Sequence, residues 1–185
     1  MSKTKTIDLT SGPILKTLAE LALPIMASSL LGTAYNITDM AWIGMLGSKA
    51  VAGVGVGGMY VWLSQGLVAL PRMGGQVNVA QACGRGDYEQ ARGYAASALR
   101  LTFLLGILFA AVCIVFIHPL LGFFNLGDAE TYTAAKLYTL ITCGLILFSF
   151  LNLTLTGLST AQGDSKTPLM ANLLGLVGNM ILDPI

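Results

Sequence analysis

The feature that most constrains this chain is a series of long runs almost without charged residues. Four runs are long enough to cross a membrane as helices, because the hydrocarbon core needs about 20 apolar residues, and a fifth is nearly so. The runs are Leu21–Gly47, Ala50–Pro71, Leu101–Gly127, Leu137–Gly163 and Thr167–Leu182. The sequence therefore predicts an all-α fold: a polytopic transmembrane helix bundle with four complete spans and most of a fifth.

The composition excludes a water-soluble domain. Only 10% of the 185 residues are charged and the mean hydropathy is +0.74, whereas soluble domains carry about 25% charged residues. The net charge of +1 offers no basic surface for nucleic acid. The chain has three cysteines, which lie in or beside apolar runs, and a single histidine, His118. We therefore expect no disulfide, no metal site and no cofactor.

The two ends of the chain carry separate signals. The polar segment Met1–Thr10 and the length of the first apolar run argue against a cleavable signal peptide. Residues 14–22 have the spacing of an amphipathic helix lying at the membrane surface, and Pro24 is expected to kink the start of the first span. The chain stops at Asp183-Pro184-Ile185 without a further loop, so we expect it to be a fragment of a longer protein.

Positive residues in the loops predict the orientation. Basic residues concentrate on the cytoplasmic side of membrane proteins. Seven basic residues fall on the side of the N-terminus: Lys3, Lys5, Lys16, Arg85, Arg92, Arg100 and Lys166. Two, Lys49 and Lys136, fall on the other. The N-terminus is therefore expected in the cytoplasm of a bacterial inner membrane. Arg72 is left out of this count, because it ends the second run, where a snorkelling side chain is expected.

Asp39 is the one charge in the first run. A carboxylate within a membrane helix costs about 2.5–3.5 kcal/mol and is usually kept because it binds or transfers something. On a helix, Ser28, Gly32, Tyr35, Asn36 and Asp39 share one stripe, and Asn172, Gly175, Asn179 and Asp183 share another in the fifth run. Polar groups facing lipid would be unsatisfied, so both stripes should face the protein interior or a water-filled cavity.

The two carboxylates are predicted at similar depth. The first and fifth runs cross in the same direction, and at about 1.5 Å per residue Asp39 and Asp183 differ by only ~3 Å in depth. Two such carboxylates cannot both stay ionised cheaply, so one would be protonated or the pair would hold a cation. Asn36 and Asn179 could add neutral oxygens to a hard ion such as Na⁺. For Asp183 a structural role as part of a helix-ending Asp-Pro pair stays open.

Other polar positions have two readings. Asn152, Thr154 and Thr156 in the fourth run either line a cavity or only bridge neighbouring helices. Tyr35, Asn36, Asn152, Thr156 and Asn172 are the candidates for a substrate cavity.

Glycine patterns also have alternatives. Gly53-x-Gly55-x-x-Gly58 matches a dinucleotide fingerprint, but no strand precedes it, so close helix packing through Gly53 and Gly57 is favoured. Two loops, around Gly84–Asp87 and Gly163–Lys166, resemble each other. The resemblance is either a trace of a duplication or the result of two similar helix caps. Gly84-Arg85-Gly86-Asp87 also has the form found in intramembrane aspartyl proteases, but it lies in an arginine-containing loop, so an enzyme is not expected.

Several spaced motifs together resemble the multidrug and toxic compound extrusion transporters, in particular the bacterial DNA-damage-inducible, DinF-like branch. The motifs are Leu23-Pro24, Tyr35-Asn36 before Asp39, Gly44, Gly84…Gly86-Asp87-Tyr88, Gly163-Asp164-Ser165-Lys166-Thr167-Pro168, Asn179 and Leu182-Asp183-Pro184. They extend over nearly the whole chain.

The resemblance implies a twelve-helix parent built from two six-helix lobes, with residues 1–185 forming the N-terminal lobe, truncated before its sixth helix. It implies export of cationic or amphipathic compounds by antiport with H⁺ or Na⁺, with Asp39, Asn179 and Asp183 as the coupling site. The partners expected are a small-molecule substrate, membrane lipid and the remainder of the same chain. A lipid-linked oligosaccharide flippase of the same superfamily and a non-transporting membrane component are the alternatives.

Overall fold

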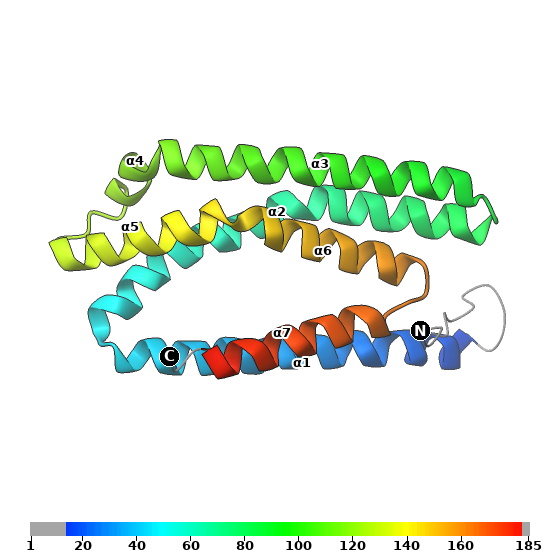
Figure 1. The fold of residues 1–185 in the computed structure, drawn as a ribbon, viewed down its shortest axis with the longest axis horizontal. Coiled ribbons are helices and arrows are strands. Elements are labelled where there is room, and N and C mark those ends of the chain that lie inside the picture. Colours follow the sequence, from blue (N-terminus) through cyan, green and yellow to red (C-terminus); the bar gives the residue numbers. More distant parts are fainter. Residues whose placement is uncertain (1–13, 183–185) are drawn as a thin grey trace.

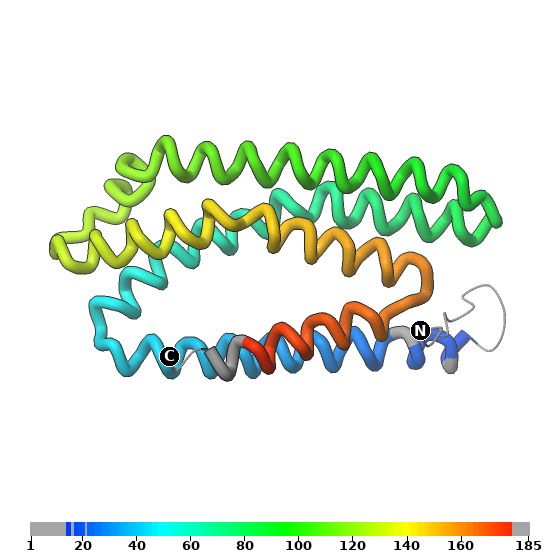
Figure 2. The backbone as a smooth tube through the Cα atoms, viewed as in Figure 1, coloured from blue at the N-terminus to red at the C-terminus, as the bar shows by residue number. Residues whose placement is uncertain are grey.

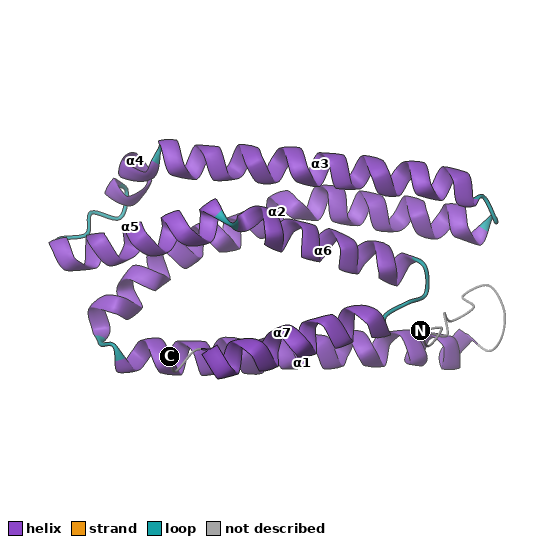
Figure 3. Ribbon diagram, in the orientation of Figure 1, coloured by secondary structure: helices purple, strands orange, loops and turns teal. Residues whose placement is uncertain are grey.

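The computed structural model describes residues 14–182, without the side chains at 16, 21 and 179–182. Helices joined by short turns make up this part of the chain, and it contains no strand (Figure 3). The helices are α1 (Ile14–Met45), α2 (Ser48–Gly84), α3 (Tyr88–Val115), α4 (Ile117–Gly122), α5 (Ala129–Gly144), α6 (Ile146–Ala161) and α7 (Lys166–Leu182). The predicted all-α class is confirmed.

The helices form two layers. α1 and α7 pack side by side in one layer, and α2, α3, α5 and α6 pack together in the other (Figures 1 and 2). A turn at Gly47 leads from α1 to α2 at one end of the molecule, and the loop between α6 and α7 joins the layers at the other. The first and the last described helices therefore belong to the same layer, which contacts the other layer mainly through these two connections.

The number of spans agrees with the apolar runs. Among the described residues, α1, α2 and α3 are each long and apolar enough to cross a membrane. α5 and α6 pass the same test only as a pair, bent by 45° at the break between them, and make a fourth span if the pair is counted as one. α7, with 17 residues, covers most of a fifth. The protein is thus a polytopic membrane protein.

Several helix boundaries in the structure differ from those predicted. α1 joins the expected surface lead-in and the first span in one helix that continues through Pro24. The fourth span starts at Ala129, before the expected start at Leu137, because Asp128 accepts a hydrogen bond from the Thr131 N–H and so caps α5. Charged Glu130 and Lys136 lie in this added part, and a search for uncharged runs therefore excludes it. The short helix α4 was not predicted either.

Glycines set the distance between α2 and α5. A Cβ on Gly53 would lie 3.0 Å from the Cβ of Ala134, and one on Gly57 would lie 2.5 Å from Cδ1 of Tyr138. Such distances leave no room for a side chain, so the close packing predicted through Gly53 and Gly57 is confirmed. The dinucleotide reading of the same glycines is wrong, since they lie within a helix that packs against another helix.

The layer of four helices contains the buried core. Val68 of α2 and Ile146 and Phe150 of α6 form one fully buried cluster. Thr102 of α3 and Thr154 of α6 are buried beside each other, with their hydroxyl oxygens 2.9 Å apart. Of the two readings for Thr154, the structure therefore shows the helix-bridging one.

The two similar loops are helix caps of one kind. Gly86 (φ 73°) and Gly163 (φ 80°) both adopt the left-handed conformation that ends a helix. In each loop the N–H of the following aspartate donates to a carbonyl five residues earlier, from Asp87 to Ala82 and from Asp164 to Ser159. This is the Schellman pattern. The aspartate carboxylate then accepts N–H groups at the start of the next helix.

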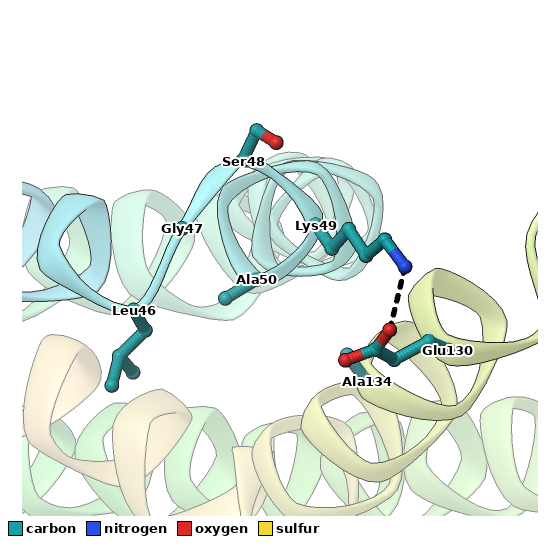
Figure 4. A pocket seen from close by; sticks show the side chains of 7 residues that line it. All are labelled: Leu46, Gly47, Ser48, Lys49, Ala50, Glu130 and Ala134. Carbon is teal, nitrogen blue, oxygen red and sulfur yellow. Dashed lines mark hydrogen bonds and ion pairs between the residues drawn. The ribbon is translucent and has the colours of Figure 1, made fainter.

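An ion-pair cluster ties the α1–α2 turn to the start of α5. The Lys49 Nζ lies 2.6 Å from Glu130 and 3.2 Å from Asp128, beside a recess lined by Leu46, Gly47, Ser48, Ala50 and Ala134 (Figure 4). The hydrogen bond from Lys49 is the main reason that the pKa of Asp128 is lowered, and the two carboxylates raise the pKa of Lys49. All three side chains are exposed, so this cluster orients the turn more than it stabilises the fold.

Candidate functional site

A pocket of about 460 Å³ lies between α1, α6 and α7. Each of the three helices contributes at least one polar side chain to its wall. The lining residues are Ser28, Leu31, Gly32, Tyr35, Asn152, Leu153, Asn172, Gly175 and Leu176. A mostly apolar wall with a few polar groups is typical of a small-molecule site.

The pocket forms where the two predicted polar stripes meet. On α1, Ser28, Gly32 and Tyr35 are spaced by four and three residues, so they project from one face. On α7, Asn172 and Gly175 do the same. α1 packs against α7, which brings these faces to one pocket. A Cβ added to Gly32 or to Gly175 would meet no atom within 4 Å, so these glycines open space between the helices.

Three of the five cavity candidates line this pocket. Tyr35, Asn152 and Asn172 do so, and Asn152 is exposed to it as the only polar residue from α6. Asn36 and Thr156 are not among the lining residues. Asn36 is exposed at the edge of the α1 stripe, turned 100° from Tyr35 along the helix. The structure leaves the roles of all five as predictions.

Asp39 lies one turn beyond Tyr35 on α1 and is half-buried. It is close enough to Tyr138 of α5 for its negative charge to act on the phenol hydroxyl. Asp39 of α1 and Tyr138 of the four-helix layer are therefore near each other. The sequence did not single out Tyr138, because a tyrosine within an apolar run is as often a packing residue as a polar contact.

The other two predicted coupling residues cannot be placed in the same way. Asn179 lies in α7, three residues from the end of the helix, and its side chain is outside the described part of the structure. Asp183 lies outside the described residues altogether. The pairing of Asp39 with Asp183 therefore stays a prediction, as does the similar depth of the two carboxylates.

The loop that positions α7 carries a second carboxylate, outside the spans. The Asp164 Oδ1 accepts the backbone N–H of Thr167 at 3.0 Å and that of Lys166 at 3.2 Å. Partial burial opposes ionisation of Asp164, but a hydrogen bond from the Thr167 side chain, these two N–H groups and the charge of Lys166 together outweigh it and lower its pKa. The ionised cap fixes the first turn of the helix that bears Asn172.

Comparison with known proteins decides the family. The MatE family model matches residues 24–185, which is most of the chain. The chain belongs to the multidrug and toxic compound extrusion (MATE) family. A MATE protein is a transporter and not an enzyme, in agreement with the sequence-based expectation. The names of the relatives do not separate the branches of the family, and the DinF-like assignment stays a prediction.

Individual relatives support the MATE assignment over nearly all of the chain. A probable multidrug resistance protein NorM of Thermotoga maritima is 29% identical over 92% of this chain and 36% of its own length. An FAD transporter of Shewanella oneidensis is 25% identical over 96% of this chain and 39% of its own. The structure of an outward-facing multidrug resistance MATE family transporter of the MOP superfamily is 27% identical, with a TM-score of 0.85 over all of this chain and 41% of that one.

The chain thus spans about two fifths of the length of the MATE proteins that it matches. The family implies a membrane setting and a small-molecule substrate. These relatives are named for multidrug resistance or for FAD transport, which gives no support to the flippase alternative.

Proposed function

We propose that the full-length protein is a secondary active transporter that exports cationic or amphipathic compounds by antiport with H⁺ or Na⁺. In this proposal Asp39, Asn179 and Asp183 form the coupling site, and Tyr35, Asn36, Asn152, Thr156 and Asn172 belong to the substrate cavity. The N-terminus lies in the cytoplasm of a bacterial inner membrane, and the remainder of the transporter supplies the sixth helix and the second lobe.

One observation carries the proposal: the polar faces of α1 and α7 meet at one pocket. Tyr35 and Asn172 line that pocket, and Asp39 lies one helical turn beyond Tyr35. A half-buried carboxylate next to a pocket for a small molecule is suited to couple the protonation or cation binding of one site to the occupancy of the other. An ionised carboxylate facing bulk lipid would be unfavourable, so the proposal requires Asp39 to face the interior of the protein.

The proposed mechanism is alternating access. Neutralisation of Asp39, by a proton or by Na⁺, removes a charge that acts on Tyr138 of the opposite layer. The packing of α1 against its neighbours then changes, with Pro24 as a possible bending point inside the helix. Because α1 lines the pocket, the change weakens the hold on substrate, which is released outward while the proton or cation moves inward.

The names of the relatives do not fix the substrate class. Proteins named for multidrug resistance and one named an FAD transporter match this chain with similar coverage. The coupling ion and the substrate must therefore be determined from this protein.

The test is Asp39→Asn in the full-length protein, which keeps the shape of the side chain and removes its titration. We expect export of a cationic dye from cells to fall to the level of cells without the transporter, with normal expression and membrane insertion. Asp87→Asn, in a loop far from the pocket, is the matched control and should export normally. Normal export by Asp39→Asn would refute the coupling role. A pH gradient and a Na⁺ gradient, imposed separately on vesicles, then distinguish the two coupling ions.

A further inference from the structure

Arg72 is a cation within a membrane helix that the proposed mechanism does not use. It lies in α2, next to α6. Its Cγ is 3.1 Å from the position that a Cβ on Gly157 of α6 would take, and the Oε1 of Gln76 is 3.4 Å from the same position. Arg72 and Gln76, one turn apart on α2, therefore face the same glycine. Gly157 is buried, so the stem of Arg72 runs between two helices and not out toward lipid.

One nitrogen of the Arg72 guanidinium is buried without an acceptor. This is Nε, which makes no hydrogen bond within the part of the chain that the structure describes. Neither α2 nor α6 contains an aspartate or glutamate, so no carboxylate on these two helices can neutralise it. Arg72 is half-buried overall: its stem lies against α6 at Gly157, and part of the side chain stays accessible. Charged groups in such places are usually paired, and an arginine fits an oxyanion best.

The position of Arg72 relative to the pocket indicates which ligand would reach it. Leu153 lines the pocket, and Gly157 is one turn further along α6, toward the loop that joins α6 and α7. Asp39 lies beyond the pocket in the other direction along α1, since α1 begins at the end where that loop lies (Figure 1). Asp39 thus lies one turn past the pocket in one direction, and Gly157, against which the stem of Arg72 packs, lies one turn past it in the other.

We propose that Arg72, with the amide of Gln76 beside it, binds an anionic oxygen group, a carboxylate or phosphate, at the end of the pocket nearest the α6–α7 loop. The inference rests on the proposed function and adds to its substrate class amphipathic compounds that carry such a group, or places a phospholipid headgroup there. In the proposed orientation this end faces the cytoplasm, from which both ligands arrive. Arg72 donates N–H bonds to the anion, and the side-chain amide of Gln76, one turn along α2, can donate one more.

Two dyes of similar size and opposite charge test the inference: fluorescein, an anion, and rhodamine 123, a cation. Their dissociation constants are measured by fluorescence anisotropy with the purified full-length protein in phosphatidylcholine nanodiscs. Loss of one charge-assisted contact corresponds to about tenfold weaker binding, so Arg72→Gln should weaken fluorescein binding by about that factor and leave rhodamine 123 within about twofold. Arg72→Lys keeps the charge and should lose less, about threefold.

The matched control is Arg100→Gln, which removes an exposed arginine of α3 and should change neither dissociation constant. In the lipid arm, phospholipid phosphorus is measured on protein purified in detergent. A loss of co-purified phospholipid in Arg72→Gln, with unchanged fluorescein binding, identifies a headgroup as the anion.

The other outcomes overturn the inference. Equal weakening of both dyes in Arg72→Gln would show a purely structural role. Arg72 would also be shown to bind no anion if two results came together. These are that the wild-type protein binds no fluorescein and that Arg72→Gln carries as much phospholipid as the wild type. Export of rhodamine 123 by cells with the wild-type protein tests the proposed function separately, because that readout does not depend on an anionic group.

Discussion

At the scale of single residues, Gly57 decides how closely α2 approaches α5. A Cβ at this position would lie 2.5 Å from Cδ1 of Tyr138 and 2.8 Å from the Thr139 Oγ1. We expect Gly57→Ala to destabilise the protein by about 1–3 kcal/mol, because two packed helices must separate to admit the methyl group. Gly55→Ala is the matched control: a Cβ there meets nothing within 4 Å. Unfolding in a denaturing detergent compares the two, and equal stability would contradict the packing role of Gly57.

The buried threonine pair allows a second prediction at this scale. The Thr102 hydroxyl is 2.8 Å from the Ala98 carbonyl oxygen, to which it donates, and it therefore accepts from Thr154. We expect Thr102→Val and Thr154→Val each to destabilise the protein, with a coupling of about 0.6 kcal/mol in the double-mutant cycle, as is usual for such bonds in membrane proteins.

Thr33→Val is the control for that cycle, because its hydroxyl bonds only to the carbonyl of Ser29 on an exposed face of α1. It should combine additively with either substitution. A coupling of zero between Thr102 and Thr154 would show that the two hydroxyls do not bond.

At the scale of elements, the loop before α7 allows a prediction with a pH dependence. Asp164→Ala removes the acceptor of two N–H groups and should cost about 1 kcal/mol in the free energy of unfolding. The folded-state pKa of Asp164 is lowered. The stabilisation is therefore complete above the unfolded pKa of about 3.9 and is lost as the pH falls through the folded pKa.

Asp164 contributes both a helix cap and a titrating carboxylate, and Asp164→Asn separates these two contributions. An asparagine still caps the helix but does not titrate, so most of the stability should remain and its dependence on pH in this range should be weaker. Thermal unfolding between pH 3 and pH 7 measures both. A pH dependence identical to that of the wild type would show that Asp164 does not contribute to it.

The apolar runs predict most of these elements, for a physical reason. A membrane span must be long and uncharged, and both properties can be counted along a sequence. The count fails for the first half of the fourth span, because Glu130 and Lys136 belong to α5. It also fails at the break between α5 and α6, since no proline or charge marks Leu145.

The candidate site also contains residues that the sequence predicts and residues that it does not. Helical spacing predicts that Tyr35 and Asn172 face the interior, because lipid cannot satisfy polar groups. It does not predict that Tyr138 packs at Gly57 or that Arg72 packs at Gly157. The glycine pattern predicts close packing at Gly57 but does not show which helix packs there.

At the scale of the whole molecule, the two layers explain where the site lies. α1 and α7 pack on each other and meet the other helices mainly at the Gly47 turn and the α6–α7 loop. The pocket occupies the space that this arrangement leaves between the layers. A small relative movement of the layers therefore changes the pocket without unpacking the core at Val68, Ile146 and Phe150.

The direction of such a movement relative to the membrane can be stated only when the side on which each end of the bundle lies is known. Glu130, at the start of α5, and Glu89, at the start of α3, mark opposite ends and are both exposed. In full-length protein without native cysteines, we expect a membrane-impermeant maleimide to label Glu130→Cys in intact cells and Glu89→Cys only after permeabilisation. The cysteine-free protein is the blank. The reverse pattern would place Arg72 at the outer end of the pocket, where an anion entering from the cytoplasm could not meet it first.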